Sequence, residues 1–191
     1  GYTIVVDFAG KGKIIYPDGV IVNDETTSNL TKNENFVVLE CVYRLLKLGY
    51  KPECIELEPK WEAPHDIGGG GKADVLVKDN AGESFLLIEC KTWGKEFDNY
   101  WKKTEQDGDQ LFFYAVQKRS TKYLCMYASN WDNGELVRKS NIISLKDNTA
   151  TLESFDEPIS FEKANDKSSL FAAWNITYGK YSFKNGIFED T

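Results

Sequence analysis

The sequence is poor in histidine and cysteine: it contains one histidine, His65, and four cysteines among 191 residues. There is no second histidine around which a Ser/His or Cys/His nucleophile system could be built. No two cysteines have C-x-x-C spacing, and each lies in an apolar stretch, which predicts buried, reduced thiols rather than disulfides or a zinc site. Because reduced thiols are typical of the cytoplasm, we expect a cytoplasmic protein.

Long apolar runs and an excess of positive charge are also missing. No apolar run approaches the roughly 18–20 residues with which a helix crosses a bilayer. Acidic residues outnumber basic ones by 30 to 23, which gives a net charge of −7. A chain of this charge does not attract nucleic acid as a whole, so any such contact requires a local patch, a metal ion or another domain.

What is present is the composition of an ordinary globular domain, with 41% hydrophobic and 28% charged residues. Thr31 and Glu34 have the T-x-x-E spacing of a capping box, and the apolar pattern that follows predicts a helix to Leu48, ended by Gly49. Its helical spacing predicts an apolar stripe that includes Glu34 and an opposite, polar stripe of Glu40, Arg44 and Lys47.

The remaining pattern predicts an α/β fold in which helices flank a mixed sheet. Period-two or continuous apolar runs predict strands at 54–58, 73–77, 85–90, 123–128 and 135–145, the last with the polarity of an edge strand. A second helix is expected over 96–117, interrupted near Gly108. The segment from Asp79 to Gly82 predicts an antiparallel hairpin between the strands on either side of it.

We expect three regions along the chain. Residues 1–30 read as an N-terminal β arm and residues 31–146 as the core. Residues 147–191 read as a C-terminal extension, with a short helix at 169–174 and a hairpin at 181–188, that leads into a further domain of a longer polypeptide. The sequence contains no internal repeat that would suggest a different division.

The residues that point to chemistry are Asp74, Glu89 and Lys91, which lie on the predicted hairpin. Alternate residues of a strand share a face, so Glu89 and Lys91 project together while Ile88 and Cys90 face the other way. One interpretation is an ordinary ion pair at a strand end. The other is a Mg²⁺ site, in which the carboxylates bind the ion and the lysine assists a water molecule in attacking phosphorus.

The segments around these residues resemble the PD-(D/E)xK nuclease superfamily. Within it they resemble the N-terminal nuclease domain of type I restriction enzyme motor subunits and of related single-chain restriction–modification enzymes. Four stretches within residues 33–117 carry the likeness: NENFVVLECVYRLLKLGY, GGKADVLV, FLLIECKTWG and GDQLFFYAVQ. The C-terminal WNITYGKYSFKNGIFED is similar to the segment that leads into an N6-adenine methylase in such enzymes. Ala73 stands where the family name has proline.

The resemblance implies a restriction-endonuclease-like fold and a metal site on the hairpin. It makes Asp74, Glu89 and the backbone carbonyl of Cys90 the ligands of Mg²⁺, with Mn²⁺ as a substitute, and it makes Lys91 the catalytic lysine. Glu34 matches the acid that supports the metal site from the first helix. Its place in a capping box explains the same residue without chemistry, and Glu40 is the alternative acid on that helix.

Other residues allow both a functional and a structural interpretation. Gln110, with Tyr114 one turn later, resembles the glutamine motif of these nucleases, and it also fits a polar position on an amphipathic helix. The loop with His65 and residues 68–71 reads as a hinge or as a contact to the DNA backbone. Trp93 and Trp101 could stack on bases, but we expect both to pack inside the protein. Candidate phosphate contacts are Lys95, Lys102, Lys103, Lys118, Arg119 and Lys122.

The resemblance therefore implies a Mg²⁺-dependent endonuclease domain acting on double-stranded DNA. Its partners would be the motor, methylase or specificity domains or subunits of the same enzyme. Three alternatives stay open: a non-catalytic DNA-clamping or docking module on the same fold, a repair or RNA-directed nuclease, and an unrelated binding protein.

Overall fold

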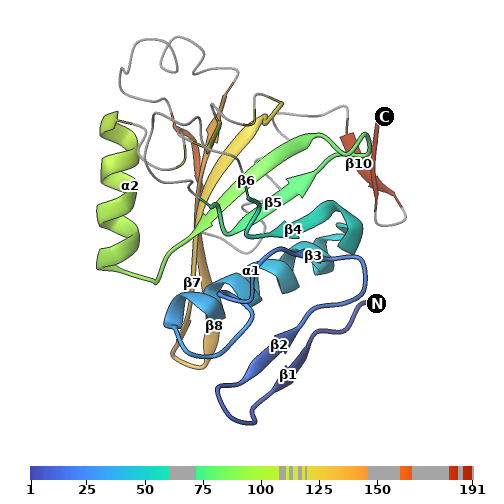
Figure 1. Ribbon diagram of the computed structural model, residues 1–191. Helices are drawn as coiled ribbons and strands as arrows, with labels where there is room; N and C mark the ends of the chain where they lie inside the picture. Colours follow the sequence, from blue (N-terminus) through green and yellow to red (C-terminus); the bar gives the residue numbers. More distant parts are fainter. Residues whose placement is uncertain are drawn as a thin grey trace.

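The computed structural model describes residues 1–60, 72–107, 111, 114–115, 118 and 120–145, together with the backbone of three later strands. Its centre is a mixed sheet of seven strands in the order β3-β4-β5-β6-β7-β8-β9 (Figure 1). The β3–β4 and β6–β7 pairs are parallel and the others are antiparallel. The strands are β3 (Ile21–Val22), β4 (Ile55–Leu57), β5 (Val75–Lys78), β6 (Ser84–Cys90), β7 (Tyr123–Asp132), β8 (Glu135–Ser144) and β9 (Ser160–Ala164).

Two helices cover opposite faces of this sheet. The helix α1 (Asn33–Leu48) packs Val38, Cys41, Val42 and Leu45 on one face, in a core that also contains the alternate residues of β5 and β6. The helix α2 (Lys95–Asp107) packs Phe97 and Trp101 on the other face, in a second core. The predicted α/β class and the mixed sheet between helices are confirmed. Neither helix of the described part is long and apolar enough to cross a membrane.

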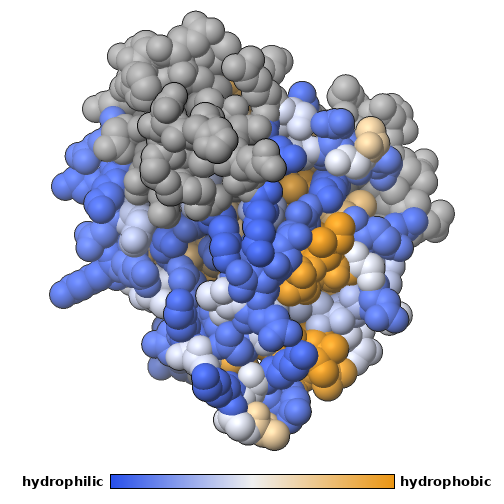
Figure 2. Space-filling view, viewed as in Figure 1, coloured by the Kyte–Doolittle hydropathy of each residue, from blue (hydrophilic) through white to orange (hydrophobic). Residues whose placement is uncertain are grey.

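The N-terminal region is only partly a separate arm. The strands β1 (Val5–Asp7) and β2 (Lys13–Ile15) form their own antiparallel hairpin, whereas β3 joins the edge of the main sheet beside β4. Figure 2 shows apolar patches on an otherwise hydrophilic face, near these N-terminal strands. The exposed apolar side chains that the strands carry are Val5, Ile15, Ile21 and Val22.

The start of α1 differs from the prediction, and its end agrees with it. The cap residue is Lys32, whose side chain makes no capping hydrogen bond. The Thr31 hydroxyl instead donates to the side-chain oxygen of Asn29, so the predicted capping box is wrong. At the other end Gly49 has φ of 102° and donates its N–H back to the helix, as expected of a glycine stop.

The predicted polar stripe of α1 is also wrong in part. Arg44 is buried, with its guanidinium 6.0 Å from the ring centre of Tyr127, and Glu40 pairs with Arg138 on β8. The stripe is covered because β7 runs on to Asp132 and returns as β8 through a tight turn, in which Asn133 and Gly134 have positive φ. Since β9 pairs with β8, the segment predicted as an edge strand lies inside the sheet.

The remaining elements fall partly outside the described residues. The helix expected over 96–117 is observed as α2, and the break near Gly108 lies outside the described residues, as does the helix expected at 169–174. A short 3₁₀ turn, η1 (Pro52–Cys54), precedes β4. The hairpin predicted at 181–188 is confirmed as β10 (Tyr181–Lys184) paired with β11 (Ile187–Asp190).

Candidate active site

The β5–β6 hairpin brings the two predicted carboxylates together. The register that pairs Val75 with Ile88 places Asp74 across from Glu89 at the end of the hairpin. The N–H of Cys90 donates to the Asp74 carboxylate at 2.6 Å, which fixes that side chain against β6. At the other end Asp79 accepts backbone N–H groups of the predicted turn.

Strand alternation turns Glu89 away from the face of Ile88 and Cys90, as the sequence predicts, and Lys91 pairs with Glu89. Ile88 and Cys90 lie in the core beneath α1, on the opposite face. The N–H of Lys91 donates to the carbonyl of Tyr127 at 2.9 Å, so its backbone continues the parallel pairing of β6 with β7. The sheet therefore fixes the backbone from which the Glu89 and Lys91 side chains project.

The Lys91 ammonium is the centre of the cluster. It lies 2.6 Å from a Glu89 oxygen, 3.1 Å from a Glu34 oxygen and 4.7 Å from the ring centre of Tyr100 on α2. Lys91 is 7% exposed and Glu89 is 5% exposed. Burial disfavours the charged lysine, but the carboxylates of Glu89, Asp74 and Glu34 outweigh that effect and hold the pKa of Lys91 above its ordinary value.

The cluster carries more negative than positive charge. Burial raises the pKa of Asp74 well above its ordinary value, and the nearby Glu89 carboxylate raises it further. The hydrogen bond from Cys90 and the charge of Lys91 act in the opposite direction without cancelling this effect. Three carboxylates face one ammonium, so the site favours an additional proton or an additional cation.

The oxygen donors present fit a hard divalent cation. Within the described part of the chain, no group of three or more His, Cys, Asp or Glu side chains is arranged to hold a metal ion. Mg²⁺ needs only one or two carboxylates, because water and phosphate oxygens complete its shell. Asp74 and Glu89 supply that number, and the Cys90 carbonyl follows Glu89 directly in the chain. Burial first, and then the Glu89 carboxylate, raise the pKa of Asp74, so a cation at the pair would offset the repulsion between the two carboxylates.

Of the two candidate acids on α1, Glu34 belongs to the cluster and Glu40 does not. Glu34 lies in the first turn of the helix, which points at the end of β6, and reaches Lys91. Glu40 lies nearly two turns later, accepts the Tyr127 hydroxyl and pairs with Arg138 at 2.6 Å. Of the two acids that the sequence left open, the structure therefore brings Glu34 to Lys91.

The other predicted residues are divided between interior, surface and undescribed parts. Gln110, His65 and residues 68–71 lie outside the described residues, as does Arg119. Trp101 is buried in the α2 core, as predicted, whereas Trp93 is 41% exposed and that prediction is wrong. The exposed lysines among the candidate phosphate contacts are Lys95, Lys102, Lys103 and Lys122.

Two contacts were not foreseen from the sequence, one within the cluster and one outside it. Tyr100 places its ring over Lys91, and Arg138 neutralises Glu40. Tyr100 is an aromatic on an amphipathic helix, which is ordinarily a packing position. Arg138 reaches α1 only because the β7–β8 hairpin is long, and no local pattern encodes that length.

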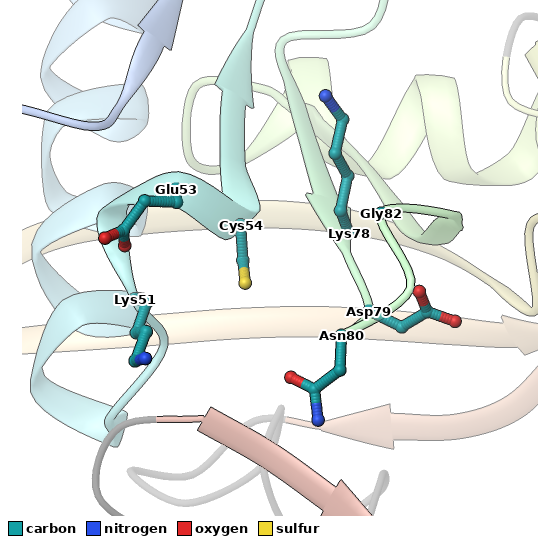
Figure 3. A pocket seen from close by; sticks show the side chains of 7 residues that line it. All are labelled: Lys51, Glu53, Cys54, Lys78, Asp79, Asn80 and Gly82. Atoms are coloured by element: carbon teal, nitrogen blue, oxygen red, sulfur yellow. The ribbon is translucent and has the colours of Figure 1, made fainter.

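A separate hollow lies at the far end of the hairpin, away from the cluster (Figure 3). Two of its charged side chains have local partners: Lys78 pairs with Glu56 at 2.6 Å, and Asp79 accepts backbone hydrogen bonds of the turn. Burial raises the pKa of the Cys54 thiol, so it is no reactive thiolate. The hollow therefore has no group poised for the chemistry that the hairpin suggests.

The chain matches no model of a known protein family, and no curated protein matches it. The cluster around Lys91 therefore carries the functional argument by itself.

Proposed function

We propose that this chain is a Mg²⁺-dependent endonuclease domain that hydrolyses phosphodiester bonds of double-stranded DNA, on a restriction-endonuclease-like fold. One observation carries the proposal: Lys91 contacts both Glu89 and Glu34 beside Asp74, where the β5–β6 hairpin ends. The contact between Glu34 and Lys91 is not a consequence of closeness in the chain, because the two residues belong to different elements and are 57 residues apart.

Each residue has a role in this proposal. Asp74, Glu89 and the Cys90 carbonyl would hold the ion. Bound there, Mg²⁺ would lower the pKa of a water molecule and polarise the phosphate. Lys91 holds the attacking water and offsets negative charge that develops on the phosphate oxygens. Glu34 acts as a positioning residue, because it is a second acceptor for the Lys91 ammonium, from a different element than Glu89.

The acidic character of the chain fits an enzyme whose DNA binding depends on other domains. A net charge of −7 opposes approach to a polyanion, and the exposed lysines are spread over α2 and the loop before β7. We place the domain in a cytoplasmic restriction–modification enzyme, with motor, methylase or specificity parts that bring the DNA to it.

The proposal is tested by incubating the protein with supercoiled plasmid, with Mg²⁺ or Mn²⁺ against EDTA. We expect metal-dependent nicking or linearisation that leaves 5′-phosphate ends. Lys91→Met should lower the rate by about 10²–10⁴-fold, the usual contribution of a general acid–base group. Lys78→Met is the matched control, since Lys78 is also an ion-paired lysine at the end of a strand of the hairpin but lies outside the cluster.

A non-catalytic DNA-docking module is the second candidate, and the close Lys91–Glu89 pair favours it. A buried ion pair can persist for structural reasons alone. In that case the wild type would show no metal-dependent cleavage, and Lys91→Met would only lower stability. Absence of cleavage by the wild type and by Lys78→Met would support the module, and equal cleavage by Lys91→Met and Lys78→Met would contradict the catalytic role of Lys91.

A further inference from the structure

A groove beside the Lys91 cluster is lined by aromatic and amide side chains. It lies between the first turns of α1, the residues after β6 and the distal half of the β7–β8 hairpin, and it encloses about 500 Å³. Figure 1 shows the tip of the β7–β8 hairpin near the beginning of α1. The residues that matter for the argument are Asn33, Phe36, Trp93, Ser129, Asn130 and Trp131.

Three large aromatic side chains of this groove face solvent. Phe36 is 47% exposed, Trp93 is 41% exposed and Trp131 is 69% exposed. Exposed aromatic rings from three different elements around one groove offer flat surfaces on which planar ligands can stack. Base–aromatic stacking is one of the two sequence-tolerant contacts that proteins make with single strands, beside the attraction of basic residues to the backbone.

The polar side chains of the groove suit an uncharged ligand rather than a phosphate. Asn33, Ser129 and Asn130 provide donors and acceptors for the edges of a planar ring system. Among the described residues that line the groove, only Glu40 is charged, and its carboxylate is held by Arg138 and the Tyr127 hydroxyl. A nucleobase fits this combination of rings and neutral hydrogen-bonding groups.

Residues of the groove are close neighbours of the cluster in the chain at two places. Trp93 follows Lys91 by two residues, and Asn33 immediately precedes Glu34. A DNA strand whose phosphate lies at Lys91 would therefore have a neighbouring nucleotide near the groove. Inside a duplex the faces of the bases are covered, so the bound nucleotide must be unpaired or flipped out.

We infer that this groove binds unpaired nucleotides of DNA that flank the phosphate at the Lys91 cluster. The inference takes the identity of the ligand from the proposed function, but the stacking contacts require neither metal nor cleavage. Binding and catalysis are therefore separable by experiment.

The experiment measures the anisotropy of a labelled 12-nucleotide oligothymidylate at low salt in EDTA, titrated with the full chain. We expect binding that is tighter than for a duplex of the same length. Trp131→Ala and Phe36→Ala should each weaken binding at least about fivefold. Tyr43→Ala is the matched control, since Tyr43 is an exposed aromatic of α1 outside the groove, and it should bind like the wild type.

The outcomes separate this inference from the endonuclease proposal. Binding is measured in EDTA, where no metal-dependent cleavage takes place, so normal binding by a wild type without any cleavage activity would still support the groove. The inference is overturned if the wild type does not bind, or if Trp131→Ala and Tyr43→Ala bind equally well. It is also overturned if Trp131→Ala changes the oligomeric state in size-exclusion chromatography and leaves oligonucleotide affinity unchanged, because the groove would then be a protein interface.

Discussion

The Lys91 ammonium lies 3.1 Å from the Glu34 carboxylate, and this contact ties the end of β6 to the first turn of α1. The same ammonium lies 2.6 Å from Glu89 on its own strand. Lys91 is thus held between a helix and a sheet, so its direction depends on where α1 begins. A shift of the helix start by one residue would rotate Glu34 by about 100° around the helix axis, away from Lys91.

The first prediction concerns that contact. Glu34→Gln removes the charge but keeps the shape, so Lys91 is held less firmly and the cleavage rate should fall about tenfold. The loss should be smaller than for Lys91→Met, because Glu34 acts through Lys91. Single-turnover cleavage checks it, with Glu53→Gln, an exposed acid after α1, as the control. A Glu34→Gln rate equal to that of the control would contradict the positioning role.

The second prediction concerns the pH dependence of stability. The pKa of Asp74 is higher in the folded protein than in the unfolded chain, chiefly through burial and then through Glu89. The folded state therefore binds more protons, and stability falls as the pH rises from the ordinary aspartate range through the raised pKa. In EDTA, Asp74→Asn should melt at a higher temperature than the wild type at pH 8. This difference should disappear near pH 4.

Circular dichroism melting curves between pH 4 and 8 measure this effect. Mg²⁺ should raise the melting temperature of the wild type and leave that of Asp74→Asn unchanged, because a ligand stabilises the state that binds it. If Asp74→Asn is less stable than the wild type in EDTA at pH 8, the prediction is contradicted, because neighbouring groups would then already stabilise the charged Asp74 carboxylate.

The third prediction concerns Glu40 and Arg138, which join α1 to β8. Their side chains are 11% and 17% exposed and lie 2.6 Å apart, so loss of either leaves a poorly hydrated charge. Glu40→Gln and Arg138→Met should each lower the free energy of unfolding, with a coupling energy of about 2 kcal/mol. Urea denaturation of the two single variants and the double variant measures it. If the losses of the two single variants add up to the loss of the double variant, the coupling energy is zero and the ion pair does not stabilise the fold.

The sequence predicts the central part of the site because that part is local. Strand alternation orients Glu89 and Lys91, and the turn at Asp79 aligns Asp74 with Glu89. One hairpin therefore accounts for these three residues of the cluster, all but Glu34. Glu34 was suggested by the family resemblance, with Glu40 as the alternative acid. The capping role of Thr31 was wrong because Asn29, two residues earlier, offers a closer acceptor.

What the sequence could not predict depends on contacts between distant elements. The burial of Arg44 and the pairing of Glu40 follow from the length of the β7–β8 hairpin, which local patterns do not encode. The exposure of Trp93 depends on the groove that this hairpin forms with α1. Composition alone predicts burial for a tryptophan, so only the assembled fold distinguishes Trp93 from Trp101.

The most direct test of the metal-dependent site is Mn²⁺ binding, measured by electron paramagnetic resonance. The wild type is compared with an Asp74→Asn/Glu89→Gln double variant and with Glu56→Gln, a control acid of β4 that pairs with Lys78 outside the cluster. The account predicts stoichiometric binding by the wild type and by Glu56→Gln, and its loss in the double variant. Equal, negligible binding by all three proteins, also with DNA present, would contradict it.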